Sequence, residues 1–231
     1  MQQVILKRRV LSDEIKEAIR TLRTNIQFCG DDKRVIMITS CLGGEGKSMV
    51  LLELACALAA LGKSVLLIDA DLRKASPSIT PENKRIRAGL TYYLAGRCDV
   101  EQATYQSNQV GVYLMPAGVT PPNPTELLSS GRMKKLILLA KESYDYVLID
   151  CAPLGIVVDA AIVAPQCDGA IMLVETGVIP YRSAREVKEK LDAAQCPILG
   201  AVLNKVDPHE NPYYGYGRNG DYNRRHDEYI E

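Results

Sequence analysis

Short apolar runs that alternate with longer helical stretches are the feature that most constrains this chain. Five runs rich in Val, Ile and Leu occur at residues 34–40, 64–69, 146–150, 169–175 and 198–204. Nearly continuous apolarity over such lengths is typical of strands buried on both faces. Helical periods lie between them, for example at residues 48–61 and 181–194. The alternation predicts an α/β fold with a mostly parallel sheet and helices on both of its faces.

The composition excludes several classes of protein. The chain has 231 residues, which suits one α/β domain with an appendage better than two full domains. Lys+Arg and Asp+Glu each total 28, so no overall field favours nucleic acid or an anionic membrane. The cysteines are scattered and form no C-x-x-C pair, which argues against a disulfide framework or zinc site and favours a reducing cytoplasm. No apolar run approaches the ~20 residues of a membrane span, so we expect membrane contact only through a partner.

The two ends of the chain differ from its centre. Ser12 is suited to cap a helix over about residues 12–27, because Ile15, Leu22 and Ile26 fall on one face. We expect a single domain over residues 1–206 and a flexible tail over 207–231, which has Pro, Gly, Asn and charge but no apolar period. The proline-rich stretch at 116–124 predicts a rigid surface loop. The tail carries five tyrosines: Tyr213, Tyr214, Tyr216, Tyr222 and Tyr229.

Residues 41–48, Cys-Leu-Gly-Gly-Glu-Gly-Lys-Ser, join the first apolar run to a helical stretch. Glycines let backbone N–H groups approach phosphate oxygens at a helix N-terminus, while Lys47 contacts the β and γ phosphates and Ser48 ligates Mg²⁺. A glycine-rich turn without a ligand is the alternative, since the common pattern has Gly in place of Cys41. We expect a nucleotide-binding loop that comprises Gly43, Gly44, Glu45, Gly46, Lys47, Ser48 and Met49.

Carboxylates follow the next two runs. Asp69 and Asp71 come at the end of one run, and Asp150 ends another. The carboxyl ends of parallel strands meet at one sheet edge, where the phosphate loop also lies. Alternation along an extended chain would point Asp69 and Asp71 to the same side. A lone aspartate at a strand end usually caps a helix or forms a turn, but three beside one phosphate loop predict a magnesium site with a neighbouring base.

The segment Asn204-Lys-Val-Asp207 has the spelling that guanine-binding GTPases use to recognise their base. A second interpretation is that Asn204 ends the last strand and contacts the edge of whichever purine is bound, with Asp207 in a turn. We favour the second interpretation, because a motif of four residues is weak evidence by itself.

Three segments together with the tail resemble the bacterial tyrosine kinases (BY-kinases) of capsule and exopolysaccharide synthesis, in the cytoplasmic form that works with a separate membrane activator. Residues 40–48, 65–74 and 147–153 resemble the Walker A, Walker A′ and Walker B segments of that family. The chain departs from the family pattern at Gly43 and Ala152, where proline is usual. Leu42 stands where the related partitioning and division-site ATPases carry a signature lysine.

The resemblance implies an ATP- and Mg²⁺-dependent protein-tyrosine kinase that regulates polysaccharide synthesis and export. It implies that Lys47 contacts phosphates, that Ser48 binds Mg²⁺ directly, and that Asp71 and Asp150 hold it through water. Asp69 is then the base toward the incoming tyrosine hydroxyl. Such a set suffices, because phosphoryl transfer depends mostly on positioning and on charge neutralisation. Arg73 is either a further positive charge near the phosphates or a structural partner of a nearby acid.

The resemblance also implies assembly and partners. Glu17, Arg20 and Arg23 match the family's oligomerisation spelling, and helical geometry predicts that they face away from the core. A homo-oligomer, such as a ring, would bring one subunit's tail tyrosines to the site of its neighbour as phosphate acceptors. Further implied partners are the cytoplasmic tail of a membrane activator and a phosphotyrosine phosphatase. The chain would be cytoplasmic and recruited to the inner face of the plasma membrane by a partner. It would have no membrane span and would bind no nucleic acid.

Three other functions compete with this interpretation. An ATP-switched positioning ATPase of the deviant Walker A class is disfavoured by Leu42. A guanine-nucleotide switch would be distinguished by competition between ATP and GTP. A non-catalytic scaffold for polysaccharide assembly is disfavoured by the presence of Lys47, Asp69, Asp71 and Asp150.

Overall fold

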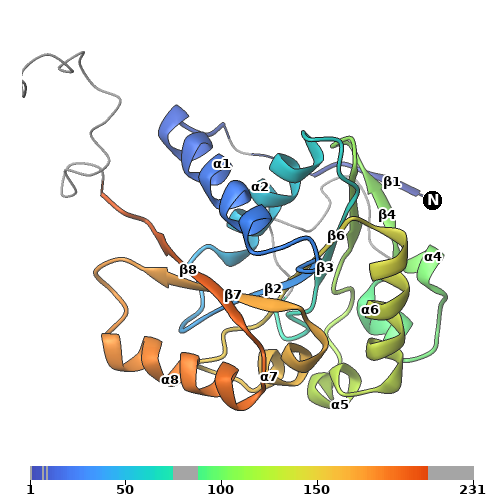
Figure 1. The fold of residues 1–231 in the computed structure, drawn as a ribbon. Coiled ribbons are helices and arrows are strands. Elements are labelled where there is room, and N and C mark those ends of the chain that lie inside the picture. Colours follow the sequence, from blue (N-terminus) through green and yellow to red (C-terminus); the bar gives the residue numbers. More distant parts are fainter. Residues whose placement is uncertain (1, 7, 9, 75–87, 208–231) are drawn as a thin grey trace, which may run out of the picture.

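The fold was analysed in a computed structural model that describes residues 2–6, 8, 10–74 and 88–207 (Figure 1). Its centre is an eight-stranded sheet with the order β1-β4-β5-β3-β6-β2-β7-β8. Among these strands only β4 and β5 pair antiparallel. The strands are β1 (Gln2–Val4), β2 (Val35–Ser40), β3 (Val65–Asp69), β4 (Tyr105–Ser107), β5 (Val112–Met115), β6 (Tyr146–Asp150), β7 (Gly169–Glu175) and β8 (Ile198–Asn204). The predicted mostly parallel sheet is confirmed.

Helices cover both faces of the sheet, as the alternation predicts (Figure 1). One face packs against α1 (Asp13–Phe28) and α2 (Lys47–Ala59). The opposite face packs against residues of most of the later helices. These are α3 (Leu90–Leu94), α4 (Val100–Ala103), α5 (Pro124–Leu128), α6 (Gly131–Ser143), α7 (Asp159–Val163), the 3₁₀ helix η1 (Ala164–Gln166) and α8 (Tyr181–Ala193).

Strand β2 and helix α2 hold the loop between them from both ends. Every residue of β2 is buried. Helix α2 buries Leu51, Leu54 and Leu58 completely against the sheet. Since β2 ends at Ser40 and α2 begins at Lys47, the glycine-rich loop has only six residues between two buried elements. Its backbone is therefore fixed by the core.

The five apolar runs all form strands, within one residue of their predicted limits. The sequence patterns did not indicate β1, β4 and β5, because strands of three or four residues carry too little alternation to be recognised. The predicted surface loop at 116–124 is wrong in part. Pro116 and Ala117 are buried, and their carbonyl oxygens accept hydrogen bonds from the N–H groups of Leu90 and Thr91. At the other end of the stretch, Pro124 begins α5.

Helix α1 matches its predicted span and cap, because the Ser12 side chain accepts a hydrogen bond from the Ile15 N–H. Glu17 and Arg20 are exposed and form an ion pair of 2.9 Å. The prediction that Arg23 faces away from the core is wrong. Its guanidinium donates to the Ala57 carbonyl oxygen of α2 at 3.2 Å, because α1 lies directly along α2.

The tail tyrosines at positions 213, 214, 216, 222 and 229 lie outside the described residues. Within the part that the structure describes, no helix combines the length and apolarity needed to cross a membrane.

Asp168 stabilises the start of β2, at the amino end of the parallel strands. Its carboxylate accepts the N–H groups of Arg34 and Val35 at 3.0 and 2.8 Å and pairs with the Lys141 ammonium. Burial opposes the ionised form, but Lys141 and the two N–H groups outweigh it and lower the pKa of Asp168. The contribution of this group to stability is therefore present above its unfolded pKa of about 3.9 and is lost as pH falls toward the lower folded pKa.

We expect Asp168→Ala to lower the free energy of unfolding by about 2 kcal/mol at pH 7, because two backbone donors lose their acceptor. Urea unfolding measures this loss, and the difference from wild type should shrink below about pH 4. The control is Asp192→Ala on α8, which removes an exposed pair with Lys188 and should change stability by less than about 0.5 kcal/mol. Equal losses in the two variants would contradict the role of Asp168.

Candidate nucleotide site

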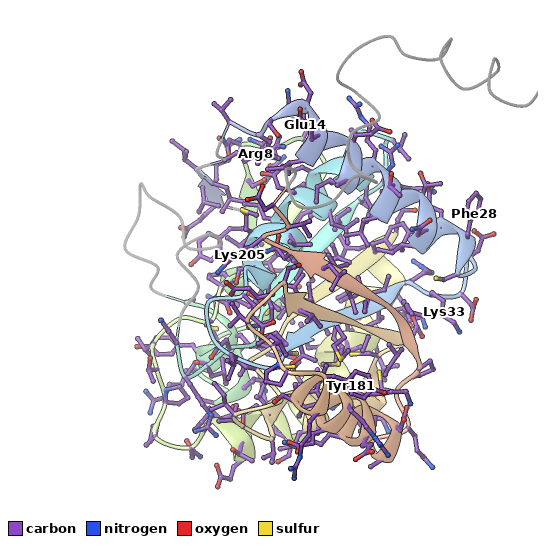
Figure 2. The ribbon with its side chains drawn as sticks, turned by 90° about the vertical axis from the view of Figure 1, so that its left-hand side faces the viewer. Arg8, Glu14, Phe28, Lys33, Tyr181 and Lys205 are labelled. Atoms are coloured by element: carbon purple, nitrogen blue, oxygen red, sulfur yellow. The ribbon has the colours of Figure 1, made fainter. Side chains whose placement is uncertain are left out.

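A cavity of about 820 Å³ lies beside the loop between β2 and α2, at the carboxyl edge of the sheet. Figure 2 labels two of its lining residues, Glu14 of α1 and Lys205 beyond the end of β8. Most of the predicted site residues line it: Gly43, Gly44, Gly46, Lys47, Ser48, Met49, Asp71, Asp150 and Asn204. The structure thus gathers residues from four separate strand ends around one space.

Glu45 is the member of the predicted loop that turns away from the cavity. Its carboxylate is buried and accepts the N–H groups of Leu42 and Glu175, the latter at 3.0 Å. These contacts tie the loop to itself and to the end of β7. The prediction that Glu45 belongs to the nucleotide-binding surface is corrected for its side chain, which stabilises the loop instead.

Cys41 occupies the position where the common pattern has glycine, and the structure explains why a side chain fits there. Cys41 is buried and its φ is not positive, so no glycine is required. The glycine that is needed at this contact is Gly155, because a Cβ there would lie 2.1 Å from the Cys41 carbonyl oxygen. Burial raises the pKa of the Cys41 thiol to about 11, which keeps it protonated.

Gly43 and Gly44 separate the effect of backbone conformation from the effect of space. A Cβ on either residue would meet no atom within 4 Å, but only Gly44 has a positive φ, of +85°. Alanine in that region costs about 1–2 kcal/mol. We expect Gly44→Ala to weaken nucleotide binding about tenfold and Gly43→Ala to leave it within about twofold, as measured by titration with a fluorescent nucleotide. Equal effects would show that the loop conformation does not limit binding.

Lys47 and Ser48 begin α2, and their side chains donate hydrogen bonds to two different strand ends. The Lys47 ammonium, on a side chain that is only 8% exposed, donates to the Ser40 hydroxyl at 2.9 Å. The Ser48 hydroxyl donates to one oxygen of Asp150. The other oxygen of Asp150 is buried and has no hydrogen-bond partner among the described residues. Such an orphaned carboxylate oxygen is unusual in a folded protein and indicates that a ligand belongs there.

Burial disfavours the charged form of both acids that line the cavity. Burial, with a smaller contribution from the charge of Asp71, raises the pKa of Asp150 to about 6 against the opposing effects of the Ser48 hydroxyl and the Lys47 ammonium. Burial likewise raises the pKa of Asp71, opposed by hydrogen bonds from Lys74 and Arg73 and by Lys47. A carboxylate pair that is short of positive charge favours a cation.

Asp69 and Asp71, which strand alternation predicts on the same side, differ in their exposure to the cavity. Asp69 ends β3, lies opposite Asp150 in the β3–β6 register and is 1% exposed. The chain leaves the strand there, so Asp71 sits in the turn that follows and donates its N–H to an Asp69 oxygen at 3.2 Å. Of the two, Asp71 alone lines the cavity.

Two further predictions concern Arg73 and Asn204. Arg73 is a structural partner, because it forms a bidentate ion pair with Asp159, which no sequence pattern singled out. Asn204 ends β8 as predicted, and its amide N–H donates to the Glu45 carbonyl oxygen at 2.7 Å. It also lies against Gly46, where a Cβ would come within 2.3 Å of the amide nitrogen. Asn204 therefore holds the phosphate loop from β8, the second strand beyond β2 in the sheet.

The donor set suits Mg²⁺ only together with a ligand. Within the described ranges, no group of three or more His, Cys, Asp and Glu residues could hold a metal ion by itself. The predicted set of Ser48, Asp71 and Asp150 offers oxygen atoms, which Mg²⁺ prefers, and Mg²⁺ commonly completes its shell with waters and substrate phosphates. The orphaned oxygen of Asp150 fits this chemistry.

Comparisons with known proteins point in one direction. A family model described as an AAA domain matches residues 33–182. Tyrosine-protein kinase CpsD from Streptococcus agalactiae is 39% identical over 210 residues, which cover 91% of this chain and 92% of that protein. The kinase domain of Escherichia coli tyrosine kinase ETK is 31% identical, with a TM-score of 0.76 over 83% of this chain and 77% of that one.

A second solved structure shares the fold. The septum site-determining protein MinD complexed with Mg-ADP, from Pyrococcus horikoshii OT3, is 29% identical, with a TM-score of 0.64. The match covers 74% of this chain and 69% of that one. The phosphate loop described above thus occurs on a fold that chains with different activities share.

Proposed function

This chain is a member of the bacterial tyrosine-protein kinase family, and we propose that it transfers the γ-phosphoryl group of ATP to tyrosine hydroxyl groups. The observation that carries the proposal is the constellation at the β2–α2 loop. Lys47 and Ser48 lie there beside Asp150, whose second carboxylate oxygen has no partner among the described residues. The likeness to tyrosine-protein kinase CpsD supports the choice of tyrosine as acceptor.

The residues of the site divide the work of binding. Ser48 would bind Mg²⁺ directly, and Asp71 and Asp150 would hold it through water. When bound, Mg²⁺ neutralises charge on the phosphates and on the two acids. Lys47, released from the Ser40 hydroxyl, would contact the transferred phosphate, and the N–H groups of the loop would bind the remaining oxygens. The likeness to MinD with Mg-ADP supports this use of the loop.

Asp69 keeps its proposed role as the base toward the acceptor hydroxyl. It lies directly beside Asp150 in the sheet but is 1% exposed. This role therefore requires the turn at residues 70–74 to open toward the acceptor. Asp71, which already lines the cavity, remains at the metal.

We propose that Asn204 contacts the edge of the purine of ATP. One N–H of its amide is engaged with the Glu45 carbonyl oxygen, and the side-chain carbonyl oxygen is an acceptor that suits the 6-amino group of adenine. The likeness to tyrosine-protein kinase CpsD supports ATP as the nucleotide, and the comparison of ATP with GTP below tests this choice.

The proposed acceptors are the tail tyrosines at positions 213, 214, 216, 222 and 229, which lie outside the described residues. We propose that a neighbouring subunit modifies them, within an oligomer formed through Glu17, Arg20 and Arg23. Since Arg23 lies against α2, Glu17 and Arg20 are the residues of this set that a neighbour reaches directly. We further propose that the cytoplasmic tail of a membrane activator recruits the chain to the inner face of the plasma membrane. A phosphotyrosine phosphatase would reverse its phosphorylation, and the cycle would regulate capsule or exopolysaccharide synthesis.

The test mixes two subunits in the presence of Mg²⁺, the cytoplasmic tail of an activator and either ATP or GTP. One subunit is Lys47→Met with an intact tail, and the other is active but has its five tail tyrosines changed to phenylalanine. We expect phosphotyrosine on the Lys47→Met subunit with ATP and little with GTP. Labelling of the wild type alone would contradict transfer between subunits, and no labelling of any chain would contradict the kinase itself.

A further inference from the structure

An ion pair with a buried carboxylate links the turn after β3, which carries Asp71, to the start of α7, in the segment that follows Asp150 and the end of β6. The Arg73 guanidinium donates from Nε to Oδ2 of Asp159 at 2.7 Å and from Nη2 to Oδ1 at 2.9 Å. Asp159 begins α7 and is 1% exposed, whereas the Arg73 side chain is 42% exposed. A two-point contact of this kind fixes orientation as well as distance. It therefore fixes the turn after β3 to the start of α7.

Thr125 of α5 closes the arrangement into a triangle. Its hydroxyl accepts from Arg73 Nη2 at 3.1 Å and donates to Asp159 Oδ1 at 3.2 Å. Three elements far apart in sequence thus converge on one carboxylate, since Arg73 and Asp159 are separated by 86 positions. The triangle leaves Asp159 well supplied with donors and without a role in the chemistry described so far.

The backbone of Arg73 carries the effect to the metal site. The N–H groups of Arg73 and Lys74 both donate to Oδ1 of Asp71, at 3.3 and 3.1 Å. The side chain of Arg73 is anchored on Asp159, and its main chain orients the Asp71 carboxylate. A shift of Arg73 would therefore move the carboxylate that faces the cavity.

We propose that Asp159 and Arg73 are positioning residues that hold the Asp71 carboxylate where it can share Mg²⁺ with Ser48 and Asp150. This inference rests on the proposed function, because it concerns the Mg²⁺ of the same site. It gives Arg73 a positioning role, because its Nε and Nη2 are engaged with Asp159 and Thr125. Loss of comparable supporting partners costs about 10–100-fold in metal affinity or activity.

A purely structural ion pair predicts a different outcome, and three variants distinguish the two. Arg73→Gln leaves a buried carboxylate without its counter-charge, so its melting temperature should fall the most. Asp159→Asn removes the buried negative charge and, with it, the two-oxygen acceptor that holds the Arg73 guanidinium. The third variant combines Arg73→Gln with Asp159→Asn and removes both charges of the pair. We therefore expect its melting temperature to lie above that of Arg73→Gln alone. Its Asp71 carboxylate remains unanchored, however, so its response to Mg²⁺ should not recover.

The experiment measures binding of a fluorescent ADP analogue by each purified chain, once in EDTA and once in saturating Mg²⁺, together with thermal melting. We expect all three variants to bind in EDTA within about twofold of wild type and to lose about 10–100-fold in the Mg²⁺-dependent gain of affinity. The control is Lys141→Gln, which breaks the pair with Asp168 at the opposite edge of the sheet. It should lower the melting temperature and keep the full gain from Mg²⁺.

A double variant that regains both its melting temperature and the full gain from Mg²⁺ would overturn the inference, as would single variants with an unchanged gain. The proposed kinase activity is judged separately by phosphotyrosine. A wild-type chain that gains affinity with Mg²⁺ but labels no tyrosine would refute the kinase. The positioning role would still be decided by the binding titration.

Discussion

Replacement of Lys47 by methionine is expected to abolish phosphotyrosine formation, with a loss of at least about 10²–10³-fold, the cost of removing one preorganised charge from a reacting group. Methionine has a similar length and apolar stem, so the space that the buried Lys47 side chain fills stays occupied. The loop should keep its shape, because the Ser40 hydroxyl still donates to the Leu42 carbonyl oxygen at 2.7 Å.

The measurement compares incorporation of labelled phosphate at equal protein concentration, with circular dichroism as the check on folding. Lys134→Met on α6 is the matched control, because it removes the same charge from an exposed position outside the cavity lining. Retained autophosphorylation in Lys47→Met, or an equal loss in Lys134→Met, would contradict the assignment of the phosphate loop.

Asp150→Ala is expected to separate activity from stability, with the two changing in opposite directions. Activity should fall by about 10²–10³-fold or more, because the acid nearest Ser48 is lost from the metal site. Stability without nucleotide should rise by about 1–3 kcal/mol, because relief of a buried carboxylate oxygen that has no partner among the described residues outweighs the loss of the acceptor of the half-buried Ser48 hydroxyl. Burial is also the largest cause of the raised pKa of this group. Functional sites commonly carry such a cost in stability.

Thermal or urea unfolding in EDTA, with and without ADP and Mg²⁺, tests both halves of the prediction. In EDTA the variant should melt at or above the wild-type temperature, whereas Mg²⁺ with ADP should stabilise the wild type far more than the variant. A variant that melts well below wild type in EDTA would show that Asp150 supports the core. It would then give no information on the metal.

Much of the site follows from local patterns. The β2–α2 loop could be located because a buried strand, closely spaced glycines and a following helix are consecutive in the chain. Asp150 and Asn204 could be placed at the same edge because parallel strands share their carboxyl ends. The role of Asp69 as base and the oligomerisation role of Glu17 and Arg20 remain predictions.

Other features could not be predicted, because they depend on contacts between distant positions. Nothing in the sequence indicates that Glu45 turns inward to the Glu175 N–H, 130 positions away, or that Arg23 lies against Ala57. That Asp71 lies beyond the end of β3, and lines the cavity where Asp69 does not, could not be predicted either, because period-two alternation cannot locate a strand end to one residue.

The sequence by itself thus determined the α/β class, the positions of five buried strands along the chain and the edge at which the phosphate loop lies, because periodicity and chain direction are properties of consecutive residues. The tertiary structure decided which polar side chains face the cavity and which support it. Asp159 illustrates the difference. It stands in an unremarkable segment before a short helix, and only packing of α5, α7 and the turn after β3 brings it to Arg73. Side-chain partners are set by how elements pack in space, and local spacing carries no information about them.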